Sequence, residues 1–148
     1  MREAAMSYGT IRVKAEILDD NPGTVENLSD VKIKYHHLGR EQKEHMYAVF
    51  LNNGNKEIGD KLLGLGTNDS VQLDYKDLAR TALLVKASAV ILVHNHPSGN
   101  ANPTDQDIKA TRDANEVLET IGVRLLDHVI ISRNDDYSMR YHSDGPFT

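Results

Sequence analysis

Two short stretches near the N-terminus, at residues 10–17 and 31–35, alternate between hydrophobic and polar positions. Alternation with a period of two is typical of a strand that buries one face. Between them, residues 19–23 (Asp-Asp-Asn-Pro-Gly) form a strong turn signal. The pattern predicts two strands that pair antiparallel, and it makes residues 1–40 a strand-rich N-terminal extension.

Two later stretches are apolar on both faces of a potential strand. Residues 46–51 form a nearly continuous apolar run, which is typical of a central strand. The sequence Asn-Asn-Gly-Asn at residues 52–55 has the composition of a hairpin turn, so residues 56–65 are predicted to return as a second strand. Residues 89–93 are uncharged and rich in β-branched side chains, which predicts another buried strand.

Helical spacing of apolar residues appears in two segments. Residues 75–86 follow Asp74, a candidate N-cap, and residues 104–121 form the second segment. Further strands are predicted at residues 123–132 and 137–141. Strands followed by alternating helices and strands predict an α/β fold, with one mixed sheet flanked by helices.

Composition limits the class of protein. The chain has 148 residues, the usual size of one domain, and we expect a single domain over residues 1–148. The absence of cysteine excludes disulfides and thiolate metal sites. A net charge of −5 without a basic cluster argues against tight nonspecific DNA binding. Because no signal segment or long apolar run is visible, we expect a cytoplasmic protein without membrane contact.

Three candidate metal ligands surround the end of the apolar strand at residues 89–93. His94 and His96 are two positions apart, so their side chains point to the same face of an extended segment. Asp107 follows in the first turn of the next predicted helix, and the loop between is long enough to return its carboxylate to the histidines. Two imidazoles and one carboxylate leave a fourth tetrahedral position for water, as in catalytic zinc sites.

Simpler explanations of these residues also fit the sequence. Two histidines at this spacing could share a loop by chance. Thr104 and Asp107 also match a capping box, with Asp107 at the position usually held by Glu or Gln. The two roles of Asp107 are compatible, because a capped first turn holds its carboxylate rigidly.

The segment from His94 to Asp107 resembles the JAMM motif of the JAB/MPN metalloproteases. That motif is His-x-His, seven residues, Ser, two residues and Asp, and Thr104 stands here in place of the serine. The sequences at residues 90–99 and 125–131 are similar to those of the bacterial RadC-like branch of the family.

The resemblance covers roughly residues 40–133 and implies the JAB/MPN fold, a curved mixed sheet flanked by helices that is similar to the cytidine deaminase fold. It implies that His94, His96 and Asp107 hold Zn²⁺, which activates water to hydrolyse a peptide or isopeptide bond in a peptide or protein substrate. RadC proteins also carry a helix-hairpin-helix-like region before this domain. Residues 1–40 predict strands instead, which weakens the expectation of DNA contact.

The family further uses a glutamate near the start of a core strand as general acid and base. Glu44 holds that position, and Glu41, one turn earlier, is the alternative. The resemblance implies that Glu44 takes a proton from the attacking water and returns it to the leaving amine. Thr104 keeps a hydroxyl that can bond to the water or to the developing oxyanion.

Two other functions remain open at this point. One is a metal-binding scaffold of the MPN type without catalytic activity, which a Glu44 side chain pointing away from the metal would favour. The other is a role in DNA repair, for which the RadC-like branch was named. The sequence does not indicate an oligomeric state.

Several polar residues near the motif are assigned structural roles. Ser98 is expected to act in a turn. Asp127 and His128 could orient a ligand imidazole, but we expect them to end a strand or to bond to the backbone. The remaining histidines are assigned to the surface: His36, His37, His45 and His142.

Overall fold

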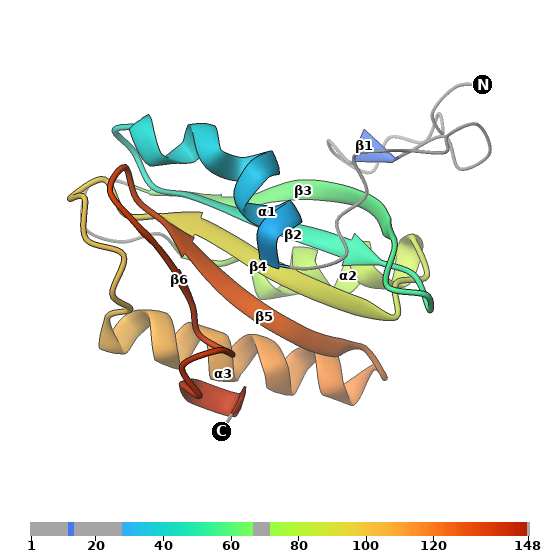
Figure 1. Cartoon of the computed structure of the whole chain (residues 1–148). Coiled ribbons are helices and arrows are strands. Elements are labelled where there is room, and N and C mark those ends of the chain that lie inside the picture. The colour runs from blue at the N-terminus through green and yellow to red at the C-terminus, as the bar shows by residue number, and fades with distance from the viewer. Residues whose placement is uncertain (1–11, 14–27, 67–71, 148) are drawn as a thin grey trace.

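The structure is a computed structural model that describes residues 12–13, 28–66 and 72–147. Six strands form one sheet in the order β1-β3-β2-β4-β5-β6 (Figure 1). Their bounds are β1 Arg12–Val13, β2 His45–Leu51, β3 Glu57–Leu65, β4 Ala89–Asn95, β5 Arg124–Ile131 and β6 Asp136–Ser138. Strands β4 and β5 are parallel and the other neighbours are antiparallel, so the sheet is mixed.

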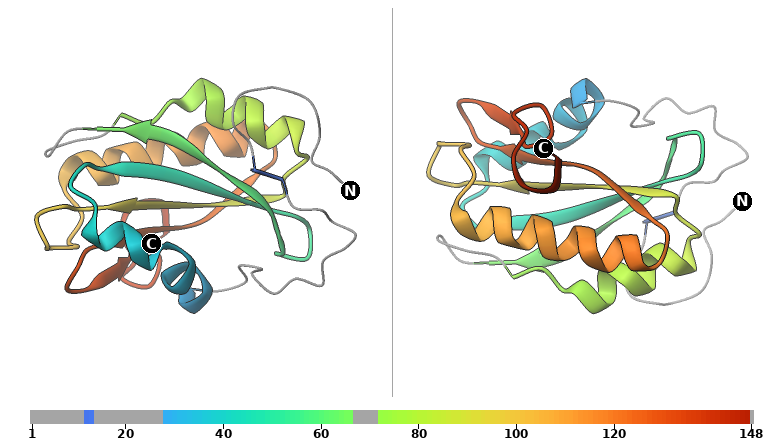
Figure 2. Two further views of the ribbon diagram at one scale, coloured as in Figure 1. Left: turned by 90° about the horizontal axis from the view of Figure 1, so that it is seen from above. Right: turned by 90° about the horizontal axis from the view of Figure 1, so that it is seen from below.

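Helices cover both faces of the sheet. They are α1 Leu28–Tyr35, α2 Tyr75–Leu84 and α3 Asp105–Thr120, with short 3-10 helices η1 His36–Arg40 and η2 Gly145–Phe147. Helices α2 and α3 lie on one face, and α1 with η1 lies on the other (Figure 2). Each layer buries its own apolar cluster against the strands. The predicted class, a mixed sheet flanked by helices, is confirmed.

Strand β4 lies between these two layers, and its seven residues are all buried. Val90 and Leu92 belong to the apolar cluster under α2 and α3, whereas Ile91 and Val93 belong to the cluster under α1. Side chains alternate between the faces of a strand. His94 therefore continues the row that faces α2 and α3, and it ends that row with a polar group inside the protein.

The strand predicted at residues 31–35 is wrong, because this segment belongs to helix α1. Val31, Tyr35 and Leu38 are buried against the sheet, at the i, i+4 and i+7 spacing of a helix that continues into η1. Ile33 is 77% exposed, although an alternating strand would bury it with its neighbours.

The predicted antiparallel pair at the N-terminus is also wrong, since helix α1 takes the place of its second strand. Of the first strand, predicted at residues 10–17, the structure describes only β1, and β1 pairs with β3. The rest of the predicted extension over residues 1–27 lies outside the described residues.

The other predicted elements are confirmed, except that the last strand, predicted at residues 137–141, is the shorter β6 and ends at Ser138. Strands β2 and β3 form the hairpin around residues 52–55, where the backbone N–H of Asn52 donates to Lys56 O. The Asp74 carboxylate caps α2 by accepting from the backbone N–H of Asp77. Within the described part of the chain, no helix is both long and apolar enough to cross a membrane.

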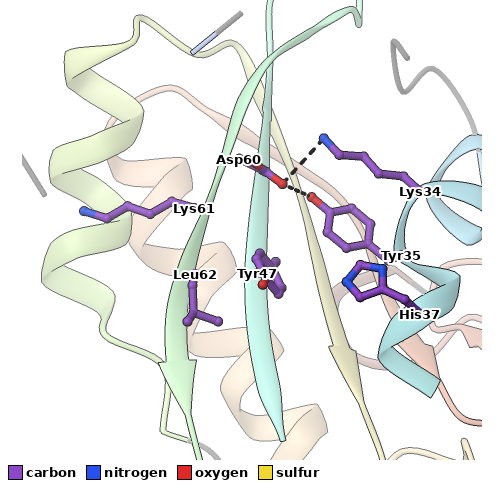
Figure 3. Close-up of a pocket in the computed structure, with 7 residues that line it drawn as sticks. All are labelled: Lys34, Tyr35, His37, Tyr47, Asp60, Lys61 and Leu62. Carbon is purple, nitrogen blue, oxygen red and sulfur yellow. Dashed lines mark hydrogen bonds and ion pairs between the residues drawn. The ribbon is translucent and has the colours of Figure 1, made fainter. Parts of the chain in front are cut away.

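A hollow of about 510 Å³ lies on the α1 face of the sheet, where Tyr35 and Tyr47 face each other (Figure 3). Its buried carboxylate, Asp60, accepts a hydrogen bond from the Tyr35 hydroxyl at 2.5 Å and lies 3.5 Å from Lys34 Nζ. Asp60 thus has a hydrogen-bond donor and a cation beside it, and Lys34 is shared with the Glu57 carboxylate. The hollow lies on the opposite face from His94.

Gly39 packs against the chain that follows β5, and we expect its replacement by Ala to destabilise the fold. A Cβ atom at Gly39 would lie 2.7 Å from the backbone oxygen of Ser132, which a side-chain rotation cannot relieve. Overpacking of this kind costs ~1–3 kcal/mol in the free energy of unfolding. Urea denaturation measures the loss. Gly54→Ala is the control, because its nearest neighbour would be a side-chain atom at 3.5 Å. Equal losses in the two variants would contradict the steric explanation.

Candidate metal centre

His94 and His96 place two imidazoles at the C-terminal end of β4. His94 is fully buried and His96 is 8% exposed, and their ring centroids are 4.8 Å apart. They face α3, whose first turn carries Asp107. Strand ends in α/β sheets are where ligands commonly bind.

Asp107 reaches both imidazoles with its two carboxylate oxygens. Oδ1 lies 3.2 Å from Nε2 of His94, and Oδ2 lies 2.9 Å from Nε2 of His96. The three side chains singled out in the sequence therefore meet at one point. Their roles as metal ligands remain a prediction.

The capping box around Asp107 is also present. The backbone N–H of Thr104 donates to Asp107 Oδ2 at 2.9 Å, and the backbone N–H of Asp107 donates to Thr104 Oγ1 at 3.1 Å. The two roles weighed for Asp107 thus coexist, and the cap fixes the carboxylate beside the rings. Because Thr104 Oγ1 accepts in this arrangement, its hydroxyl proton can donate to a further acceptor.

Glu44 lies beside His94. In the antiparallel pairing of β2 with β4, Met46 is opposite His94, so Glu44, two residues earlier, falls on the same face. Glu44 is 5% exposed, and its Oε1 lies 4.0 Å from His94 Nε2. Carboxylate and imidazole atoms of Glu44, His94 and His96 lie within 4.8 Å of one another. The alternative candidate, Glu41, is exposed at the end of η1.

Asn95 holds the backbone on both sides of Glu44. Its Oδ1 accepts from the backbone N–H of His45 at 2.7 Å, and its Nδ2 donates to the Lys43 carbonyl oxygen at 3.0 Å. Asn95, the last residue of β4, lies between His94 and His96 in the sequence and is fully buried. Asn95 was not among the predicted site residues, although a polar residue at the end of an apolar strand was a usable signal.

His128 is a second residue whose role was not predicted correctly. It lies fully buried on β5, with Nε2 2.7 Å from His94 Nδ1 and Nδ1 2.7 Å from Thr111 Oγ1 on α3. The expected strand-end or backbone role of its ring is therefore wrong, because the ring bonds to a candidate ligand and to a helix.

Asp127 and Ser98 have the structural roles that were expected. Asp127 accepts hydrogen bonds from the backbone N–H groups of His128 and Arg140 and from the Ser138 hydroxyl. Ser98 Oγ accepts from the backbone N–H of Asn100, which stabilises the turn after His96.

Burial and the Asp107 carboxylate set the charges in this cluster. Burial lowers the pKa of His94, and Asp107 opposes only part of that effect. Burial also acts to lower the pKa of His96, but its hydrogen bonds to Asp107 and to the Asn100 carbonyl raise that pKa above its ordinary value. Burial acts to raise the pKa of Asp107, yet the two imidazoles hold it far below its usual range. Asp107 is therefore an anion between the rings.

A divalent metal fits this set of atoms. His94 Nε2 is buried and, among the described residues, has no aligned hydrogen-bond partner. His96 donates its Nδ1 proton to the Asn100 carbonyl oxygen at 2.8 Å, so its Nε2 lone pair faces Asp107 when the ring is neutral. When both rings are neutral, their Nε2 lone pairs point at the negatively charged Asp107 carboxylate. A cation bound among these atoms would compensate the buried negative charge. Imidazole and carboxylate groups are ligands that Zn²⁺ accepts.

Comparison with known proteins gives a consistent family assignment. A UPF0758 protein of Streptococcus suis is 35% identical over 109 residues, which are 74% of this chain and 44% of that protein. That of Desulforudis audaxviator is 38% identical over 98 residues, 66% of this chain and 43% of the relative. That of Carboxydothermus hydrogenoformans is 33% identical over 120 residues, 81% of this chain and 51% of the relative. The chain spans about half the length of the curated relatives it matches.

The family profile that matches extends beyond the motif. It covers residues 25–144, and so includes helix α1 as well as β4, α3 and the strands that surround the histidines. On this match, the chain belongs to the RadC-like JAB domain family.

Proposed function

We propose that the chain is a zinc-dependent hydrolase that cleaves a peptide or isopeptide bond. The observation that carries the proposal is the buried Nε2 atom of His94, which makes no hydrogen bond with the described residues, lies 3.2 Å from Asp107 Oδ1 and has the Glu44 carboxylate 4.0 Å away. A candidate metal ligand (His94), a negatively charged group (Asp107) and a candidate base (Glu44) thus lie next to one another.

His94, His96 and Asp107 are the proposed metal ligands. Asp107 contacts both imidazoles directly and is held in place by the capping box, whereas Glu44 lies farther from His94. A bound zinc ion would lower the pKa of a water molecule toward ~7 and so supply a nucleophile at neutral pH. Glu44 would then act in proton transfer and not as a metal ligand.

Glu44 and Thr104 supply the other steps of the proposed reaction. Glu44 accepts a proton from the attacking water, and it returns that proton to the amine as the amide bond breaks. The Thr104 hydroxyl donates to the carbonyl oxygen as negative charge develops there. The placement of Glu44 next to His94 supports this function over that of a metal-binding scaffold without a base. No observation on the described residues favours a role in DNA repair, and the net charge of −5 speaks against DNA binding.

Zinc content is the first test of the proposal. Protein purified without chelator or affinity tag is expected to contain about one zinc ion per chain by mass spectrometry, as a three-ligand catalytic site would. His96→Ala is expected to lose the zinc and to stay folded by circular dichroism. The matched control is His36→Ala, which removes an exposed histidine and should keep it. Failure of the unchanged chain to bind zinc, even when zinc is added, would overturn the hydrolase proposal.

A further inference from the structure

The hydrogen bonds behind His94 form a continuous chain from β4 to α3. His94 Nδ1 lies 2.7 Å from His128 Nε2, His128 Nδ1 lies 2.7 Å from Thr111 Oγ1, and Thr111 Oγ1 lies 2.6 Å from the backbone oxygen of Asp107. The side chains of His94, His128 and Thr111 are fully buried. The chain of bonds therefore joins one candidate ligand, through two other side chains, to the backbone of another.

The direction of each bond follows from counting protons. A backbone carbonyl can only accept, so the single hydroxyl proton of Thr111 goes to Asp107 O. Thr111 Oγ1 must then accept from His128, which places a proton on His128 Nδ1. The other acceptor near the hydroxyl, Met139 Sδ, is weaker and more distant at 3.5 Å.

The same count continues to the candidate metal ligand. The His128 ring is fully buried, and its two nitrogens contact the Thr111 hydroxyl and the His94 ring, neither of which would balance a positive charge; the ring is therefore neutral and holds one proton. Since that proton is on Nδ1, His128 Nε2 accepts, and His94 Nδ1 must be the donor. With its one proton on Nδ1, a neutral His94 ring leaves a lone pair on Nε2; that atom lies 3.2 Å from Asp107 Oδ1 and makes no hydrogen bond with the described residues.

We propose that Thr111 and His128 are positioning residues of the metal centre, which hold His94 in the tautomer that leaves Nε2 free to bind a metal. The role of Thr111 and His128 as positioning residues rests on the proposed zinc site, but the tautomer of His94 can be measured in the metal-free chain. The opposite polarity, with Thr111 donating to His128, would put a proton on His94 Nε2. Thr111 and His128 thus decide which nitrogen of His94 is available.

The first measurement needs no substitution. Long-range ¹⁵N–¹H spectra of the metal-free protein distinguish the protonated from the unprotonated ring nitrogens of His94 and His128. We expect both rings to carry their proton on Nδ1. A proton on His94 Nε2 would overturn the proposal, whether or not the protein binds zinc. Absence of zinc binding with the expected tautomers would instead reject the zinc hydrolase and leave the assigned proton positions standing.

Thr111→Val provides the second measurement, because it removes the hydroxyl and keeps the shape. We expect a proton to appear on His94 Nε2 and zinc affinity, measured by competition with a chelating dye, to fall about 10–100-fold. Thr111→Ser restores the hydroxyl and should bind zinc as the unchanged chain does. Thr81→Val makes the same change at a fully buried threonine of α2, away from the histidines, and should leave both readouts unaltered. Unchanged zinc affinity and tautomers in folded Thr111→Val would reject the inference; if that variant does not fold, the tautomers of the unchanged chain decide.

Discussion

The Glu44→Gln variant is expected to lose ~10²–10⁴-fold in kcat for amide hydrolysis and to bind zinc as tightly as the unchanged chain. Glutamine keeps the size of the side chain and its hydrogen-bonding oxygen, but it cannot carry the proton. The substrate for this test is a fluorogenic isopeptide that joins the C-terminal carboxyl group of a short peptide to a lysine ε-amine. Cleavage is followed by fluorescence, and zinc affinity by dye competition.

The expected size of this loss depends on how firmly Glu44 is held. The Asn95 amide bonds to the backbone on both sides of it, and the carbonyl oxygen of Glu44 also accepts from the backbone N–H of Gly66 at 2.8 Å. A carboxylate on such a fixed segment stays near His94 without help from the substrate. Proton transfer by a group positioned in this way contributes more than transfer by a mobile one.

Glu41→Gln is the matched control, because it makes the same change on an exposed residue three positions earlier. We expect it to keep full activity. The pair of measurements also separates the two roles that geometry allows for Glu44, which lies with both histidines in one possible ligand cluster. Loss of zinc together with activity in Glu44→Gln would make Glu44 a ligand and contradict its role as the base.

The central strand and the histidines could be predicted from the sequence because local patterns determine them. The run at residues 89–93 is apolar on both faces, and the structure buries both faces of β4. His94 and His96 follow that run at the end of the strand, and Thr104 and Asp107 mark a helix start by their spacing alone. Each of these features depends only on residues that are close in the sequence, so its prediction did not require knowledge of tertiary contacts.

Helix α1 was predicted wrongly because its sequence fits two periods. Val31, Ile33 and Tyr35 alternate as in a strand, while Val31, Tyr35 and Leu38 have helical spacing. The two interpretations differ in the position of Ile33, which a strand would bury with its neighbours and the helix leaves exposed. A segment of five residues is too short for its periodicity to settle the element, and packing against β4 and β5 then decides it.

The roles of Asn95 and His128 depend on how strands pair, which the sequence pattern does not give. Asn95 reaches the backbone beside Glu44 only in the antiparallel register of β2 with β4. His128 lies opposite Leu92 in the parallel pairing of β4 with β5, after a register shift between Val90 and Ile91. A different register would move the His128 ring away from His94. Residues that support a site from a distant strand are thus harder to predict than the residues that form it.

Zinc at about 100 times its Kd is expected to raise the Tm of the unchanged chain by roughly 5–10 °C. Binding to the native state alone stabilises it by ~2.7 kcal/mol at that concentration. Each kcal/mol shifts the Tm of a chain of this length by about 2–4 °C. Removal of zinc with a chelator should return the Tm to its starting value. Differential scanning calorimetry with and without zinc measures the change.

Asp107→Asn should abolish most of this zinc-dependent shift. The amide oxygen can still accept from the backbone N–H of Thr104, so the helix cap is kept, but the negative charge between His94 and His96 is lost. Asp105→Asn removes an exposed carboxylate from the same first turn and should keep the full shift. An equal shift in Asp107→Asn and in the unchanged chain would place the stabilising zinc elsewhere. Loss of the shift in Asp107→Asn alone would identify its carboxylate, and not the acidity of the helix start, as the group that holds the metal.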